Sequence, residues 1–236
     1  GGHKNVNLKK ALMVSSNTYF FKLAYQSDIK DLASYFSLFG FGSRVCRDCF
    51  DEDPAFVPSP EWKYKNFNIP WFTGDTVNIG VGQGYLVATP IQLANYIAIL
   101  ANKGSLPQPT LIKDTNMSIE SRSKSATLSK EDWVKMHDAM TAVIESDFGT
   151  ARSIRDLKNF KVAGKSGTAE LVSLDSKEAY LEVRDTESLR DHSIIIAFGP
   201  MPNPKYAVSV VIENGESGGA VAGPVAIEVL KSLLNE

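Results

Sequence analysis

The sequence predicts an α+β fold in which helices come first and an antiparallel sheet, flanked by helices, comes last. Apolar residues recur at helical spacing through the first part of the chain, as far as Ile144. The last third instead holds short apolar runs joined by a proline-rich turn, which is the pattern of a hairpin. Because strands and helices are segregated rather than alternating, the pattern favours α+β over a parallel α/β sheet.

The composition indicates a folded globular chain and argues against nucleic-acid binding and membrane-spanning helices. The chain has 236 residues, of which 43% are hydrophobic and 22% charged, proportions typical of a folded globular chain. Its formal net charge of −2 gives no concentrated basic surface for phosphates, so we expect no nucleic-acid partner. No apolar run reaches the roughly 18 residues that a membrane-spanning helix needs. The opening Gly1-Gly2-His3 is not a targeting leader and resembles the interior of a longer protein, so we expect a segment upstream of it.

Two helices are expected near the start of the chain. Apolar residues near helical spacing predict the first over residues 8–25, although the polar run Ser15-Ser16-Asn17 interrupts it. The second is expected over 28–38, with Ser27 or Asp28 as its N-cap.

Residues 40–78 are expected to be irregular, because prolines and aromatic residues are interleaved there. Long loops in compact domains tend to be functional. The following run, Gly80-Val81-Gly82-Gln83-Gly84, lacks both the G-x-G-x-x-G spacing and the lysine of phosphate-binding loops. We interpret it as a tight loop that requires positive φ.

Two further helices have clear start signals. Thr89-Pro90 begins one of them, with threonine as N-cap and proline at the first helical position. After a polar linker over 105–128, Ser129 and Asp132 resemble a capping box that begins the next, which ends at Gly149-Thr150-Ala151.

Strands are expected over 160–171, 193–198 and 206–212. The prolines of residues 199–204 predict the turn between the last two strands, and Pro224 begins a closing helix.

Cys46 and Cys49 form a single C-x-x-C. Without a second pair they cannot supply the four ligands of a structural zinc site. We interpret them as a surface pair in a loop, and a disulfide is the next interpretation if the compartment is oxidising. A redox centre is least favoured, because neighbouring acids such as Asp51 and Glu52 raise the pKa of a thiol.

Two short polar patterns predict chemistry when they are taken together. Ser15-Ser16-Asn17 lies inside an apolar helix, where alone it would be a solvent-facing stripe. Lys165-Ser166-Gly167-Thr168 lies in a glycine-flanked strand, where alone the lysine would be an exposed edge-strand residue. The order S-x-N and then K-[ST]-G is two thirds of the signature of β-lactamases and penicillin-binding proteins, which are serine acyl-transferases.

On these motifs the chain resembles the transpeptidase domain of class B penicillin-binding proteins, and among them the elongation-type enzymes. The likeness follows the family's order and also covers 71–76, 80–85, 88–92, 213–215 and 223–224. It implies a serine β-lactamase-like fold of which residues 1–236 form the C-terminal part. Residues 1–150 would be its helical and loop part with S-x-N, and 151–236 its sheet part with K-S-G-T and the closing helix.

The family's first motif, S-x-x-K, carries the nucleophilic serine and precedes S-x-N. Two formal matches, Ser27-Asp28-Ile29-Lys30 and Ser121-Arg122-Ser123-Lys124, follow S-x-N and lack a buried helix that would lower the pKa of the lysine. We therefore expect the nucleophile to lie upstream of this sequence, and this chain alone to be inactive and unlabelled by penicillin.

The resemblance implies a peptidoglycan D,D-transpeptidase that cross-links stem peptides through a serine acyl-enzyme, needs no cofactor and is a target of β-lactams. Ser15 would relay a proton and Asn17 would bind the substrate amide. Lys165 would add positive charge near the substrate carboxylate and favour proton transfer through Ser15.

The strand motif would bind the substrate. The hydroxyls of Ser166 and Thr168, on either side of Gly167, would hold the substrate carboxylate, and the Thr168 N–H would be one oxyanion donor. Tyr180, in the charged stretch 171–191, is expected to border the substrate groove, while most of that stretch is a solvated connection.

The resemblance also implies partners and a location. The expected partners are the D-Ala-D-Ala stem peptide, β-lactams, the N-terminal portion that carries S-x-x-K, and a membrane glycan polymerase. The location would be the periplasmic face of the bacterial inner membrane, with the parent protein anchored by one upstream helix. The alternative is a β-lactam-sensing or β-lactamase-type domain of the same fold, against which residues 80–92 favour a transpeptidase.

We expect no metal. Some relatives place metal-ligating residues near His3, including a cysteine beside S-x-N, but position 16 is serine here. His137 on a helix and His192 before a strand are interpreted as structural or exposed histidines rather than catalysts.

Overall fold

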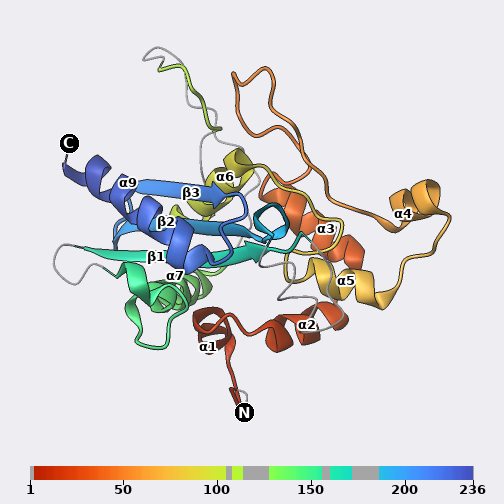
Figure 1. The fold of residues 1–236 in the computed structure, drawn as a ribbon, viewed down its shortest axis with the longest axis horizontal. Helices are drawn as coiled ribbons and strands as arrows, with labels where there is room; N and C mark the ends of the chain where they lie inside the picture. The colour runs from red at the N-terminus through yellow and green to blue at the C-terminus, as the bar shows by residue number, and fades with distance from the viewer. Residues whose placement is uncertain (1–2, 105–107, 114–127, 156–159, 172–185, 236) are drawn as a thin grey trace. The chain divides into compact units, whose positions relative to one another are not determined.

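The structure is a computed structural model that describes residues 3–104, 108–113, 128–155, 160–171 and 186–235 (Figure 1). The chain forms two compact units, with a border inside one helix. Lys4–Ser15 and Val134–Glu236 make up the sheet unit. Gly1–His3 and Ser16–Trp133 make up the helical unit.

The sheet unit is built on a three-stranded antiparallel sheet in the order β1-β2-β3 (Figure 1). Its strands are β1 (Lys161–Ala169), β2 (His192–Met201) and β3 (Tyr206–Ile212). All three predicted strands are present, and β2 continues into the proline-rich turn, where Gly199 lies opposite Tyr206. An antiparallel sheet that follows a helical segment confirms the α+β prediction.

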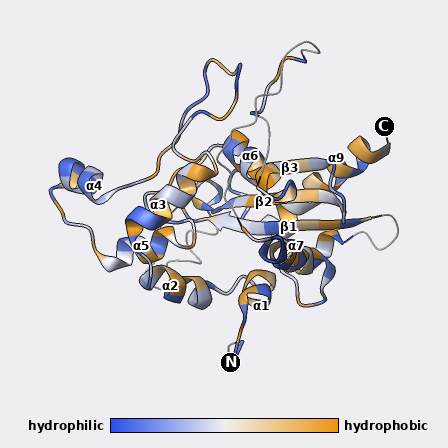
Figure 2. Ribbon diagram, turned by 180° about the vertical axis from the view of Figure 1, so that it is seen from behind, coloured by the Kyte–Doolittle hydropathy of each residue, from blue (hydrophilic) through white to orange (hydrophobic). Residues whose placement is uncertain are grey.

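A closing helix covers the sheet. The π-helical turn η3 (Gly218–Ala222) leads into α9 (Gly223–Asn235), and Figure 2 shows hydrophobic residues along β3 and α9. Val162, Ile195 and Ala197 of the sheet share one buried cluster with Ala226 and Leu230 of α9. Each is at most 1% exposed, so this cluster is the hydrophobic core of the unit.

The first helix is shorter than predicted. Residues 8–25 form two helices, α1 (Leu8–Met13) and α2 (Asn17–Tyr25), rather than one interrupted helix. Ser15 has φ +50°, a left-handed conformation in which a right-handed helix cannot continue. The polar run is therefore a break between helices, and the prediction of a single helix was wrong.

Three other helices agree with their start signals. Asp28 caps α3 (Ile29–Leu38) by accepting from Lys30 N–H. Thr89 and Gln92 form a capping box at the start of α6 (Pro90–Ala101). The Ser129 hydroxyl accepts from Asp132 N–H at the start of α7 (Lys130–Glu145), and the short helix η1 (Arg152–Ile154) follows.

Residues 40–78 are not irregular throughout. They contain α4 (Pro60–Phe67) and all but the last residue of α5 (Thr73–Ile79), and the prediction missed both helices. Pro60 stands at the start of α4, where a missing N–H costs nothing, and Ser59 caps that helix through Trp62 N–H. The proline that suggested a loop is a helix-start signal.

The interleaved aromatic residues of this segment surround a buried ion pair. Lys63 is 4% exposed, and its Nζ lies 2.6 Å from the Asp75 carboxylate. The same Nζ lies 4.9 Å from the centre of the Phe72 ring and 5.9 Å from that of Tyr85. The pair and the rings fix α4 and α5 against each other, because an unpaired charge at this depth would be costly.

The glycine run is only partly as predicted. Gly82 and Gly84 have positive φ, but Gly80 does not. A β-carbon on Gly80 would collide with that of Ala24, so this glycine lets α5 approach α2 closely.

Cys46 and Cys49 are joined by a disulfide, and Cys46 is buried, which corrects the interpretation as a surface pair. The Glu52 carboxylate accepts from the N–H groups of Val45 and Cys46, each at 2.8 Å.

In the part of the chain that the structure describes, no helix is both long and apolar enough to cross a bilayer.

Candidate functional site

Lys165 is the centre of the candidate site. It lies on β1 opposite Ile196, and its half-buried Nζ donates to Ser15 Oγ at 2.6 Å and to the Ser166 carbonyl at 2.5 Å. Burial lowers the pKa of Lys165 from 10.5 to about 8. Among the described residues no carboxylate lies within ion-pair distance to oppose this shift. The amine is therefore mostly charged at pH 7 and loses its proton as the pH rises through about 8.

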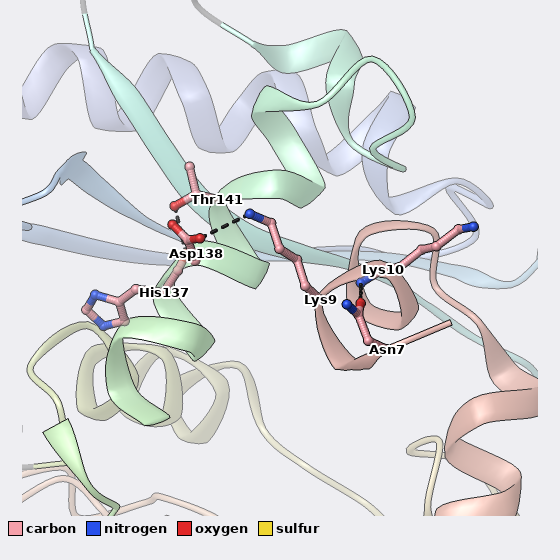
Figure 3. Close-up of polar contacts among 6 residues, drawn as sticks. All are labelled: Asn7, Lys9, Lys10, His137, Asp138 and Thr141. Atoms are coloured by element: carbon pink, nitrogen blue, oxygen red, sulfur yellow. Dashed lines mark hydrogen bonds and ion pairs between the residues drawn. The ribbon is translucent and has the colours of Figure 1, made fainter. Parts of the chain in front are cut away.

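Ser15 is held beside β1 by the way α1 ends. The Thr150 N–H donates to the Met13 carbonyl at 3.1 Å, which ties the last turn of α1 to the segment after α7. Lys9 of α1 also reaches Asp138 of α7 at 3.0 Å, as Figure 3 shows, while Asn7 caps the start of α1. Because Lys9 and Asp138 are both exposed, their ion pair adds little stability and the backbone bond is the firmer tie.

The strand motif around Lys165 is closely packed. Ser166 Oγ lies 3.0 Å from Thr150 Oγ1. Gly218 lies so close to the Gly167 backbone that a β-carbon there would collide with it. The Thr168 hydroxyl donates to the Glu216 carbonyl at 3.2 Å, and Glu216 has a positive φ of +59°.

Ser15 and Lys165 are therefore in contact, and Thr150 joins the Ser166 hydroxyl to the Ser15 hydroxyl. Asn17 is an exposed residue at the start of α2 and belongs to the helical unit. Tyr180 and the formal match at 121–124 lie outside the described residues. The catalytic and substrate-binding roles assigned to the site residues stay predictions.

The two histidines have structural partners. The His137 ring is buried, with its centre 5.1 Å from that of Phe198, and Figure 3 shows it turned away from the pair of Lys9 and Asp138. His192 Nδ1 accepts from the Asn214 N–H at 3.0 Å.

Thr150 is the site residue that the sequence analysis missed. We interpreted Gly149-Thr150-Ala151 only as the end of a helix. Thr150 stands between two small residues, separated from β1 by η1, and nothing in the spacing placed it beside Ser15, 135 residues away in sequence.

The arrangement suits proton transfer. An amine of lowered pKa that donates to a hydroxyl can replace the proton that this hydroxyl gives to a leaving group.

The described residues also include one group that could hold a metal, Cys46, Asp48 and Cys49, but both of its sulfurs are used in the disulfide. The candidate site itself offers hydroxyl, carbonyl and amine groups.

The fold and this site define a class of protein. Residues 1–231 match the penicillin binding protein transpeptidase domain, and the chain belongs to that family. Among its relatives, the peptidoglycan D,D-transpeptidase MrdA of Haemophilus influenzae is 36% identical over 242 residues. That match covers 100% of this chain and 37% of the relative, so the chain spans a little over a third of the length of such relatives.

Solved structures agree with the family. The penicillin-binding protein 2 of Pseudomonas aeruginosa, in complex with WCK 5153, has a TM-score of 0.85 and 36% identity, over 98% of this chain and 50% of that one. The penicillin-binding protein 2 of Helicobacter pylori, in complex with MreC, also has a TM-score of 0.85, with 28% identity over 99% of this chain and 41% of that one. These matches confirm the predicted family and fold.

Proposed function

We propose that residues 1–236 form part of one transpeptidase domain that cross-links peptidoglycan stem peptides and is acylated by β-lactams. The hydrogen bond from Lys165 Nζ to Ser15 Oγ is the observation that carries this proposal. This bond places the charged amine of Lys165 against the hydroxyl that would relay a proton, that of Ser15. Both groups lie beside β1, whose Ser166 and Thr168 would bind the substrate carboxylate. The names of the relatives support the same reaction.

The proposed reaction has two acyl-transfer steps. A serine outside this chain gives its Oγ proton to the lysine of its S-x-x-K motif, and its Oγ attacks the carbonyl carbon of the D-Ala-D-Ala amide. The C–N bond breaks, and D-alanine leaves with a proton passed from Ser15, which Lys165 replaces. The peptide is then an ester of the serine. An acceptor amine attacks that ester, the C–O bond breaks, the serine recovers a proton, and the cross-link is complete.

We propose that the nucleophilic serine lies outside these 236 residues. Within the chain, the match at residues 27–30 is unsuitable, because Ser27 Oγ donates to the Leu23 carbonyl and Lys30 is exposed at the start of α3. An S-x-x-K lysine needs a buried setting to act as a base near neutral pH. The isolated chain would then be inactive.

The test compares acylation rates in a longer polypeptide that contains this chain and the nucleophile. We expect Lys165→Ala to lower the second-order rate of labelling by a fluorescent penicillin about 10²- to 10³-fold. The matched control is Lys161→Ala, an exposed lysine of the same strand, which should label at the parent rate. Equal labelling of the parent protein and Lys165→Ala would contradict the proposal.

The stability of the adduct separates this function from its alternative. Release of hydrolysed penicillin within seconds would assign a β-lactamase. If the adduct persists, cross-linking of a stem peptide with D-Ala-D-Ala separates a transpeptidase from a β-lactam sensor.

We further propose a location and partners. The parent protein would lie at the periplasmic face of the inner membrane beside a glycan polymerase, and because a similar protein was solved with MreC, a partner of that kind is part of the proposal. Cell fractionation and co-purification with the polymerase test these points, and a cytoplasmic protein without such partners would contradict them.

A further inference from the structure

Thr150 lies in the middle of a continuous line of polar side chains. Lys165 Nζ donates to Ser15 Oγ, Ser15 Oγ lies 3.2 Å from Thr150 Oγ1, and Thr150 Oγ1 lies 3.0 Å from Ser166 Oγ. These groups come from separate segments of the sheet unit: the end of α1, the turn after α7, and β1. Among the described side chains, Thr150 therefore joins the hydroxyl of Ser15 to the hydroxyl of Ser166, whereas Lys165 reaches Ser166 only at its carbonyl.

The backbone around Thr150 is fixed although its side chain is exposed. Its N–H donates to Met13, and the next N–H, that of Ala151, donates to the Val143 carbonyl at 3.0 Å. Gly149 lies against the same Val143 carbonyl, where a β-carbon would collide. A threonine held this firmly at the surface can present its hydroxyl in one place, which a freely rotating surface residue cannot do.

The number of donatable protons on these side chains limits which hydrogen bonds Thr150 can form. Each hydroxyl has a single proton to donate. When Ser15 gives its proton to a leaving amine, its Oγ needs donors, and Lys165 is one of them. Thr150 is placed to be the other, while its own oxygen can still accept from Ser166.

We propose that Thr150 is a positioning residue for acyl transfer: its hydroxyl orients Ser15 and Ser166 and donates to Ser15 Oγ as that oxygen gives up its proton. This inference rests on the proposed transpeptidase function. In the step, the Ser15 O–H bond breaks and an N–H bond forms on the leaving amine. Lys165 replaces the proton on Ser15, and Thr150 keeps its own proton throughout.

The test uses Thr150→Val, which keeps the shape of the side chain and removes the hydroxyl, in the longer polypeptide that contains the nucleophile. Acylation by a D-Ala-D-Ala peptide amide should fall about 10- to 100-fold. Acylation by the matching thioester should fall less than about threefold, because a thiolate leaves without taking a proton. Thr150→Ser should recover most of the lost amide rate, since it restores the donor.

The matched control is Thr141→Val, on α7, whose hydroxyl donates to the His137 carbonyl (Figure 3) and touches no residue of the line. It should leave both rates unchanged. Equal losses with amide and thioester, or no recovery in Thr150→Ser, would overturn the inference while the proposed function stands. If the parent protein is acylated by neither substrate, the proposed function fails, and the inference with it.

Discussion

At the scale of single residues, the charge of Lys165 is the property on which the proposed chemistry depends. Its amine donates to Ser15 and faces no described carboxylate, and burial lowers its pKa to about 8. The ammonium is the form that attracts a substrate carboxylate and supplies a proton to Ser15. Deprotonation should therefore remove both contributions together.

We predict that acylation of the longer polypeptide slows as the pH rises through about 8. Below this value Lys165 is protonated and the rate should be constant, whereas above it the neutral amine dominates and the rate should fall about tenfold per pH unit. The measurement is the second-order rate of penicillin labelling between about pH 6 and 9.5. Lys165→Arg should be slower but without the fall near pH 8, because a guanidinium stays charged. A rate that rises through pH 8 in the parent protein but not in Lys165→Arg would show that the neutral amine of Lys165 is the active form.

The sequence motifs predicted that Ser15 and Lys165 lie together but not how they meet. S-x-N and K-S-G-T identified Ser15 and Lys165, whose contact spans 150 residues of chain. The contact depends on the left-handed backbone of Ser15 and on the bond from Thr150 to Met13. Neither leaves a pattern in one sequence, so Thr150 was missed.

At the scale of elements, local signals were most reliable where a helix begins with its own cap. The starts at Asp28, Thr89 and Ser129 were predicted correctly, because capping residues and the groups they satisfy are neighbours in sequence. The helix α4 was missed although Ser59 and Pro60 mark its start, because the prolines and aromatic residues around it were interpreted as a loop. Its pairing with α5, through buried Lys63 and Asp75 and the rings beside them, leaves no local signal. Such partners come together only in the folded chain.

Gln92 shows how one buried amide holds an element in place. It is fully buried on α6, and its Nε2 donates to the carbonyls of Pro54 at 2.7 Å and Ser43 at 3.0 Å. Its Oε1 accepts from Thr89 N–H at 3.0 Å. One side chain thus satisfies backbone groups of the loop that carries the disulfide and of the start of α6.

We predict that Gln92→Met, which keeps the size and flexibility of the side chain, lowers the free energy of unfolding by about 2–4 kcal/mol. The loss comes from buried carbonyls left without donors. The measurement is chemical denaturation followed by tryptophan fluorescence, because Trp62 and Trp71 lie in this unit. Gln26→Met, at an exposed glutamine, is the matched control and should change stability by less than about 0.5 kcal/mol. Equal effects of the two substitutions would contradict this account of Gln92.

At the scale of the whole molecule, the order of elements determined the fold class before any contact was known. Helices, then a hairpin-connected sheet, then a closing helix led to α+β, and the sheet with α9 on it agrees. The division into two units was not predictable in the same way. It places Ser15 in one unit and Asn17 in the other, although only Ser16 separates them in the motif.

The claim on which the account depends is that Lys165 and Ser15 serve a serine from outside this chain. The most direct measurement is mass spectrometry of the longer polypeptide after reaction with a penicillin, with the adduct mapped to a single residue. The account predicts one adduct, on a serine outside residues 1–236, and no gain in mass for the 236-residue chain alone. An adduct on Ser15, Ser166 or any other residue of this chain would contradict it.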